Sequence, residues 1–147
     1  MVGALTSART IRRSTGIGQA DLRKVIGVDD LLLFTRAVRR VGLPEKLGRY
    51  IVDLVAASRP TVPGHPEFVA EYVAWGAGLR ASQNIALAAK ALAAMGGRAT
   101  VSAGDIRRSI VPVLRHRIGL SFRAEVDRVR VEDIIGRLVQ AVPAPTA

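Results

Sequence analysis

The sequence predicts an all-α domain, a small bundle of about six helices. Its 147 residues suffice for one domain with a sizeable core, and 49% are hydrophobic, which excludes a disordered chain. Apolar residues recur at helical spacing in successive segments, and no segment has the two-residue alternation typical of a half-buried strand. Clusters of proline and glycine separate these segments.

The first two helices are expected after a basic lead-in, residues 1–28. Asp29 and Asp30 favour a helix start because they complement the positive end of the helix dipole, and Gly42 ends that helix. Pro44 suits the first turn of the second helix, which is the clearest amphipathic helix in the chain. The apolar stripe of the first helix comprises Leu31, Phe34, Val38 and Val41, and the stripe of the second comprises Leu47, Ile51, Leu54, Val55 and Ser58.

The middle of the chain is predicted to hold a loop and two more helices. The loop covers residues 59–66 and is rich in proline, and a short helix is expected from Glu67 to Trp75. Gly76-Ala77-Gly78 then ends this helix. The alanine-rich segment from Ala81 to Met95 predicts a strong helix, which Gly96-Gly97 closes.

Two further helices complete the predicted bundle. Ser102 and Asp105 resemble a capping box, with Asp in the position usually held by Glu or Gln, and Pro112 is expected to kink or interrupt the helix that follows. Residues 119–127 are expected to be irregular. The last amphipathic helix carries Val131, Ile134, Ile135, Leu138 and Val139. The sequence thus assigns the helical domain to residues 29–142 and a tail to residues 143–147.

Composition and missing motifs narrow the function. Twenty-two basic and twelve acidic residues give a net charge of +10, which indicates an anionic partner. Cysteine is absent, which excludes a disulfide scaffold and a thiol nucleophile. No apolar run approaches the length of a membrane span and no signal peptide is present, so a cytoplasmic protein is expected. His65 and His116 lack carboxylates at ligand spacing, so no metal site is predicted.

Arg80 has a position that helix propensity does not explain. It falls in the first turn of a long predicted helix, where a cation opposes the helix dipole. An arginine beside free backbone N–H groups and a glycine turn is well placed to bind an anion such as phosphate. The alternatives are a solvated Arg80, or an ion pair with Glu67 or Glu71 from the preceding helix.

The segment around Arg80 resembles the sensor-2 region of MoxR-family AAA+ ATPases. The similar residues run from Glu71 to Gln83 and include Trp75-Gly76-Ala77-Gly78-Leu79-Arg80-Ala81-Ser82. The resemblance continues in order and spacing through the downstream helices, and upstream residues resemble the start of the same family's C-terminal lid. It covers roughly residues 10–140 and is confined to the lid, since the sequence has no Walker A, Walker B or sensor 1 motif.

The resemblance implies the function of an AAA+ lid. Arg80 would be the sensor-2 arginine that completes the nucleotide site of an ATPase core, with Gly78 and Ala81 beside the cofactor. ATP and Mg²⁺ are implied for the full-length ATPase and neither is expected for this fragment, which alone should be inactive. The implied partners are the lid's own core, neighbouring subunits of a chaperone or remodelling ring, and a von Willebrand factor A-domain protein. Leu79 departs from the family pattern, which usually has proline there to fix the entry angle of the helix.

A basic helical nucleic-acid-binding module is the alternative function. From Arg80 to Arg130 there are ten basic residues against three acidic ones, and a helix–turn–helix can be drawn with its second helix near Ser102. Residues 106–117 lack the asparagine, glutamine and lysine expected of a helix that reads bases. No sequence-specific nucleic-acid binding is therefore expected.

Overall fold

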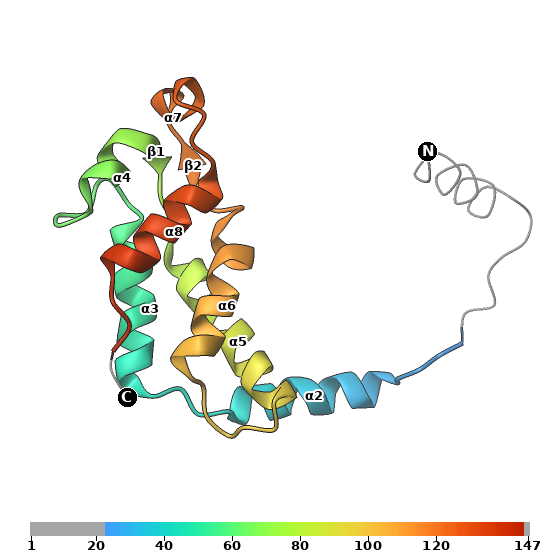
Figure 1. Cartoon of the computed structure of the whole chain (residues 1–147). Helices are drawn as coiled ribbons and strands as arrows, with labels where there is room; N and C mark the ends of the chain where they lie inside the picture. The colour runs from blue at the N-terminus through green and yellow to red at the C-terminus, as the bar shows by residue number, and fades with distance from the viewer. Residues whose placement is uncertain (1–22, 146–147) are drawn as a thin grey trace, which may run out of the picture. The chain divides into compact units, whose positions relative to one another are not determined.

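The computed structural model describes residues 23–145, which are mostly helical, as the sequence predicts (Figure 1). In chain order the elements are α2 (Val28–Arg40), α3 (Glu45–Ala57), α4 (Glu67–Tyr72), β1 (Val73–Trp75), α5 (Leu79–Met95), α6 (Ala103–Leu114), β2 (Gly119–Leu120), α7 (Phe122–Val126) and α8 (Val131–Ala141). The chain divides into two compact units, Met1–Leu32 and Leu33–Ala147, and α2 crosses the division. Most of the predicted lead-in lies outside the described residues.

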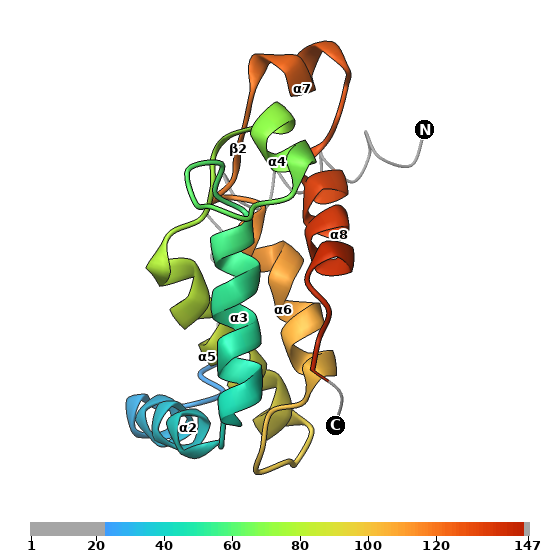
Figure 2. The same cartoon turned by 90° about the vertical axis from the view of Figure 1, so that its left-hand side faces the viewer.

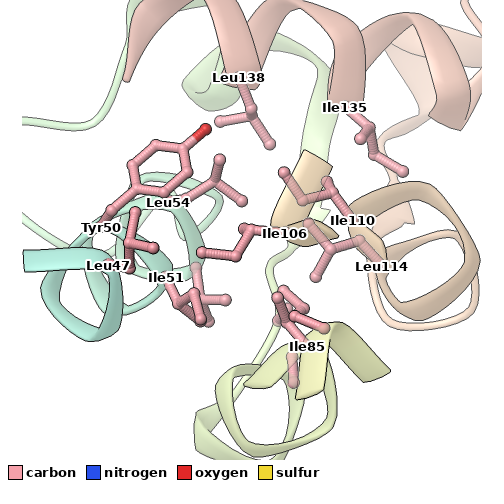
Figure 3. Packing of buried hydrophobic residues seen from close by; sticks show 14 of the residues in the cluster. Leu47, Tyr50, Ile51, Leu54, Ile85, Ile106, Ile110, Leu114, Ile135 and Leu138 are labelled. Atoms are coloured by element: carbon pink, nitrogen blue, oxygen red, sulfur yellow. The ribbon is translucent and has the colours of Figure 1, made fainter. Parts of the chain in front are cut away.

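The core of the second unit lies between α3, α5, α6 and α8 (Figure 2). Figure 3 shows their apolar side chains pointing toward one another, among them Leu54 of α3, Ile85 of α5 and Leu138 of α8. Each of these three side chains is at most 1% exposed, and burying one such side chain contributes about 1.5–3 kcal/mol. The apolar stripes predicted for α3 and α8 are therefore the core-facing sides of these helices.

The stripe predicted for α2 is not buried in the same way. Phe34 is 52% exposed, and no residue of α2 is fully buried. Only Val41, just beyond the helix, joins the core, with 7% exposure. Helical periodicity therefore predicted the helix itself but not the burial of its apolar side.

The α2–α3 connection is tied to the α5–α6 connection by backbone hydrogen bonds. Gly42 N–H donates to the Ala99 carbonyl at 2.8 Å, and Val101 N–H donates to the Gly42 carbonyl at 2.9 Å. At the end of α5, Gly97 has φ of +67°, the left-handed conformation that closes a helix and that glycine adopts without strain. The predicted closure of this helix by Gly96-Gly97 is confirmed.

The start of α6 also follows the sequence prediction, and Pro112 does not interrupt the helix. Ser102 Oγ accepts from Asp105 N–H at 3.3 Å, and Asp105 Oδ2 accepts from Ser102 N–H at 2.9 Å, which completes the capping box. Pro112 was expected to kink or interrupt the helix, but α6 runs through it to Leu114. Only the last turn follows Pro112, so most of the helix keeps its hydrogen-bond ladder.

A small antiparallel sheet corrects two expectations. The helix predicted to reach Trp75 ends at Tyr72, because Val73 to Trp75 form β1 and pair with β2. Val73 lies opposite Leu120, and Trp75 lies opposite Gly119 with an irregularity in the register. A side chain at Gly119 would overlap the Trp75 indole. This long-range pairing outweighs the local helical preference of residues 73–75.

The second correction concerns residues 119–127, which were expected to be irregular. They contain β2 and the short helix α7, whose first turn is capped by Ser121 Oγ accepting from Ala124 N–H at 3.3 Å. In Figure 1, α4, α7 and the two strands lie together at one end of the bundle. β1 leads from that end directly into the turn before α5.

Candidate functional site

Arg80 is the second residue of α5, directly after a turn made by residues 76–78. Gly78 is the N-cap, in extended conformation, and no side chain caps the helix there. The first turn of α5 contains no acidic residue. The start of this 17-residue helix therefore has an arginine where helices usually carry a carboxylate or a capping hydroxyl.

The Arg80 side chain is exposed, and within residues 23–145 it forms no ion pair or side-chain hydrogen bond. Glu71, one of its two candidate partners, instead faces Arg123, with Oε1 3.8 Å from Nε. Glu67, the other candidate partner, forms no ion pair within residues 23–145. The ion-pair interpretation of Arg80 is thus not supported, and the guanidinium is available to an anion.

Gly78 and Ala81, the other two predicted site residues, differ in what they offer a ligand. Gly78 is exposed, and a Cβ added to it would meet no atom within 4 Å. Ala81 is 0% exposed because its methyl group packs in the core, and its N–H donates to the Gly78 carbonyl at 2.9 Å. The open surface of the turn is therefore formed by Gly78, Leu79 and Arg80.

Leu79 occupies the first position of α5 and is 71% exposed. The helix begins at this residue without a proline in its first turn. Trp75, on the other side of the turn, is 65% exposed. Arg80 is thus preceded in the chain by exposed apolar side chains rather than by acidic ones.

The turn is attached to the end of α3 by Ser58, which the sequence pattern places only on an apolar stripe. Ser58 is 0% exposed, and its Oγ accepts from Ala77 N–H at 3.0 Å and donates to the Val55 carbonyl at 2.7 Å. A serine on the core-facing side of an amphipathic helix must find hydrogen-bond partners inside the protein. That pattern was the available signal for Ser58.

Gly76 lies against the backbone of the same segment. A Cβ on Gly76 would overlap the Ser58 carbonyl oxygen and lie 2.7 Å from Arg59 Cα. The Arg59 Nε is buried and has no hydrogen-bond partner among the described residues. Only glycine permits this approach of the turn to the end of α3.

The arrangement at the start of α5 fits a phosphate group. A guanidinium offers donors in a fixed fork, and the N–H groups of an uncapped helix start point toward an anion.

No group of three His, Asp or Glu side chains that could hold a metal ion occurs within residues 23–145. A hollow of about 460 Å³ lies elsewhere, along α3 and residues 142–145, and Arg80 does not line it. No helix in the described part of the chain is long and apolar enough to cross a membrane.

Comparison with known proteins gives consistent matches. Residues 67–138 match the family described as AAA lid domain. The chain is 32% identical over 137 residues to Chaperone MoxR1 of Mycobacterium tuberculosis, a match that covers 93% of this chain and 36% of that protein. The fold is similar to the crystal structure of a candidate ATPase from Cytophaga hutchinsonii, with a TM-score of 0.79 and 28% identity over 97% of this chain and 43% of that one.

The chain thus spans about a third of the length of the curated relative that it matches. The family match begins at α4 and ends in α8, so it contains the turn and the whole of α5 and α6. The similarity in sequence and in fold extends over nearly the whole chain. Residues 67–138 thus belong to the AAA lid domain family, and the chain as a whole is similar to Chaperone MoxR1.

Proposed function

We propose that this lid contributes Arg80 as the sensor-2 residue of a MoxR-type AAA+ ATPase. The observation that carries the proposal is an exposed arginine that has no acidic partner within residues 23–145. It lies in the first turn of a 17-residue helix that no side chain caps. A cation in that position costs about 0.3–1 kcal/mol against its own helix dipole. A bound phosphate removes this penalty, because it pairs with the guanidinium and also accepts from the helix N–H groups.

In this proposal the nucleotide is ATP with Mg²⁺, bound mainly by the ATPase core. The bound nucleotide supplies the phosphoryl group and the metal ion. Arg80 donates to the terminal phosphate and stabilises the negative charge that spreads over its oxygens during transfer. Gly78 has no side chain that would keep the nucleotide away from the backbone at the start of α5.

The similar proteins suggest what the full-length ATPase does. The relative from Mycobacterium is called a chaperone. We propose that the ATPase containing this lid assembles as a ring in the cytoplasm and remodels other proteins, with a von Willebrand factor A-domain protein as partner. The lid then contacts its own core and a neighbouring subunit.

The test is steady-state ATP hydrolysis by the ATPase that contains this lid, with Arg80→Ala as the variant. Loss of a charge-assisted hydrogen bond of ~1.5–3 kcal/mol lowers the rate roughly 10- to 150-fold if it is felt fully in the transition state. Arg80→Lys should restore activity only in part, because an ammonium lacks the two-pronged geometry of the guanidinium. Ring assembly is checked by size.

Arg108→Ala is the matched control. Arg108 is an exposed helical arginine with no ion pair within residues 23–145, so its removal changes the net charge equally. Arg98 is unsuitable because it pairs with Asp105. Equal activities of the Arg80→Ala and wild-type enzymes would refute the sensor-2 role. A loss caused by disassembly of the ring would assign Arg80 to a subunit interface instead.

A further inference from the structure

The end of α3 is attached to the turn before α5 by one buried hydroxyl group. Ser58 Oγ accepts a hydrogen bond from Ala77 N–H at 3.0 Å, and the two residues are 19 positions apart in the chain. Both are buried, Ser58 with 0% and Ala77 with 1% exposure. The same hydroxyl donates to the Val55 carbonyl at 2.7 Å, which fixes the direction of its lone pairs. The hydroxyl thus donates one hydrogen bond and accepts another.

Arg80 lies between two buried residues, Ala77 and Ala81. On the C-terminal side Ala81 is fixed by burial in the core. On the N-terminal side Gly78 and Leu79 are exposed and pack against little, so the nearest fixed point is Ala77. We propose that Ser58 is the positioning residue for Arg80: it holds Ala77 and thereby sets the direction in which α5 presents the guanidinium to a phosphate. This inference rests on the proposed sensor-2 function.

The close approach of Gly76 explains why the attachment is stiff. Gly76 packs directly on the Ser58 carbonyl, so the turn is held by backbone contact at one residue and by a hydrogen bond at the next. Loss of the hydroxyl leaves the buried Ala77 N–H without a partner, and an unsatisfied buried group is relieved when the segment moves toward water. Gly78, Leu79 and Arg80, the exposed residues between Ala77 and Ala81, would then shift with Ala77.

Ser109 provides a matched control within the same domain. It is a buried helical serine, 3% exposed, whose hydroxyl donates to the Asp105 carbonyl at 2.8 Å. Ser58 and Ser109 therefore make the same kind of hydrogen bond to their own helix. Only Ser58 also accepts from a residue outside its helix, so comparing Ser58→Ala with Ser109→Ala isolates the bond to Ala77.

The first experiment uses the 147-residue chain and needs no nucleotide. Amide hydrogen exchange is followed by NMR for Ala77 and for reference amides in the middle of α5. Ser58→Ala should speed exchange at Ala77 by about 10-fold or more relative to those references, and Ser109→Ala should leave that ratio within about twofold. An unchanged ratio in Ser58→Ala would overturn the inference whatever Arg80 does.

The second experiment is a double-mutant cycle in the ATPase that contains this lid. Ser58→Ala should lower kcat/KM for ATP about 3- to 10-fold, and it should have little further effect when Arg80 is already alanine. Independent, additive losses would overturn the positioning role. If Arg80→Ala alone is silent, the sensor-2 proposal fails, whereas the exchange experiment still decides whether Ser58 holds the turn.

Discussion

Arg98 and Asp105 form a two-pronged ion pair across the connection between α5 and α6. Arg98 Nη1 lies 2.6 Å from Asp105 Oδ2, and Nη2 lies 2.7 Å from Oδ1. Asp105 is 3% exposed, whereas the Arg98 side chain is 43% exposed. The hydrogen bonds from Arg98 hold the pKa of this carboxyl well below its usual range, with burial opposing them and bonds from Ser102 adding to them.

The first prediction concerns this ion pair and pH. Arg98→Ala should lower the free energy of unfolding at pH 7, because the buried carboxylate of Asp105 loses its charged donor. A carboxyl whose pKa is depressed by folding stabilises the fold above its unfolded pKa, and this contribution is lost as the pH falls through the folded value. The difference in the free energy of unfolding between Arg98→Ala and wild type should therefore shrink below about pH 4. Urea denaturation between pH 7 and pH 2.5 measures it.

Arg108→Ala serves as the control for that series. It removes an exposed arginine of α6 that has no acidic partner within residues 23–145, so it should change stability little at any pH. A difference between Arg98→Ala and wild type that stays constant from pH 7 to pH 2.5 would contradict the assigned role of Asp105.

The second prediction compares two glycines in the same turn. Gly76→Ala should cost about 3 kcal/mol, because its Cβ would overlap the backbone of Ser58. Gly78→Ala should cost less than about 1 kcal/mol, because its Cβ meets open space and its backbone is extended. Chemical denaturation of both variants gives the comparison, and similar costs at the two positions would contradict the described packing of the turn.

The third prediction concerns the end of α7. Arg128 has φ of +56°, and Val129 N–H bonds to the Ala124 carbonyl at 2.9 Å, so Arg128 occupies the left-handed closing position that glycine prefers. Arg128→Gly should stabilise the domain by about 1 kcal/mol. Arg128→Ala removes the same charge and keeps the strain, so it should give no such gain. Thermal unfolding distinguishes them, and an equal gain in both variants would assign the effect to charge.

The fourth prediction concerns nucleic acid. With a net charge of +10, the chain should bind DNA weakly and lose affinity steeply as salt rises, because its arginines neutralise phosphates without reading bases. Titration at about 150 mM salt with one duplex and scrambled competitors provides the measurement. A preference of 10³-fold or more, which is typical of specific readers, would favour the nucleic-acid-binding alternative over the ATPase lid.

Most of the helices, and the core-facing sides of α3 and α8, could be predicted from local patterns. The 3.6-residue spacing in α3 and α8, the Ser102–Asp105 capping box and the glycines after α5 each act within a few residues. The β1–β2 pair could not, because Val73 is a strand residue only when Leu120 lies beside it. Local preference favours a helix through residue 75, and tertiary pairing decides otherwise.

Of the candidate site, the sequence predicts Arg80 but not the contact of Ser58 with the turn. The unusual cation at a helix start indicated Arg80 from the sequence alone, and the resemblance gave it a role. The sequence pattern places Ser58 only on an apolar stripe, because its partner, the N–H of Ala77, lies 19 positions away. Leu31 and Phe34 form a regular stripe but are about half exposed, since periodicity does not say what a helix packs against.

The end of the domain that contains β1 and β2 should fold late, because its contacts join segments far apart in the chain. The Arg98–Asp105 pair closes a separation of 7 residues, whereas Ser121 Oγ reaches the Glu71 carbonyl across 50. Closing the longer loop costs more chain entropy, so the α5–α6 hairpin forms early and the β1–β2 pairing forms late. φ-values should accordingly be high near Asp105 and low near Ser121. The end of the domain that leads into the Arg80 turn is then the last part to assemble and the first to open.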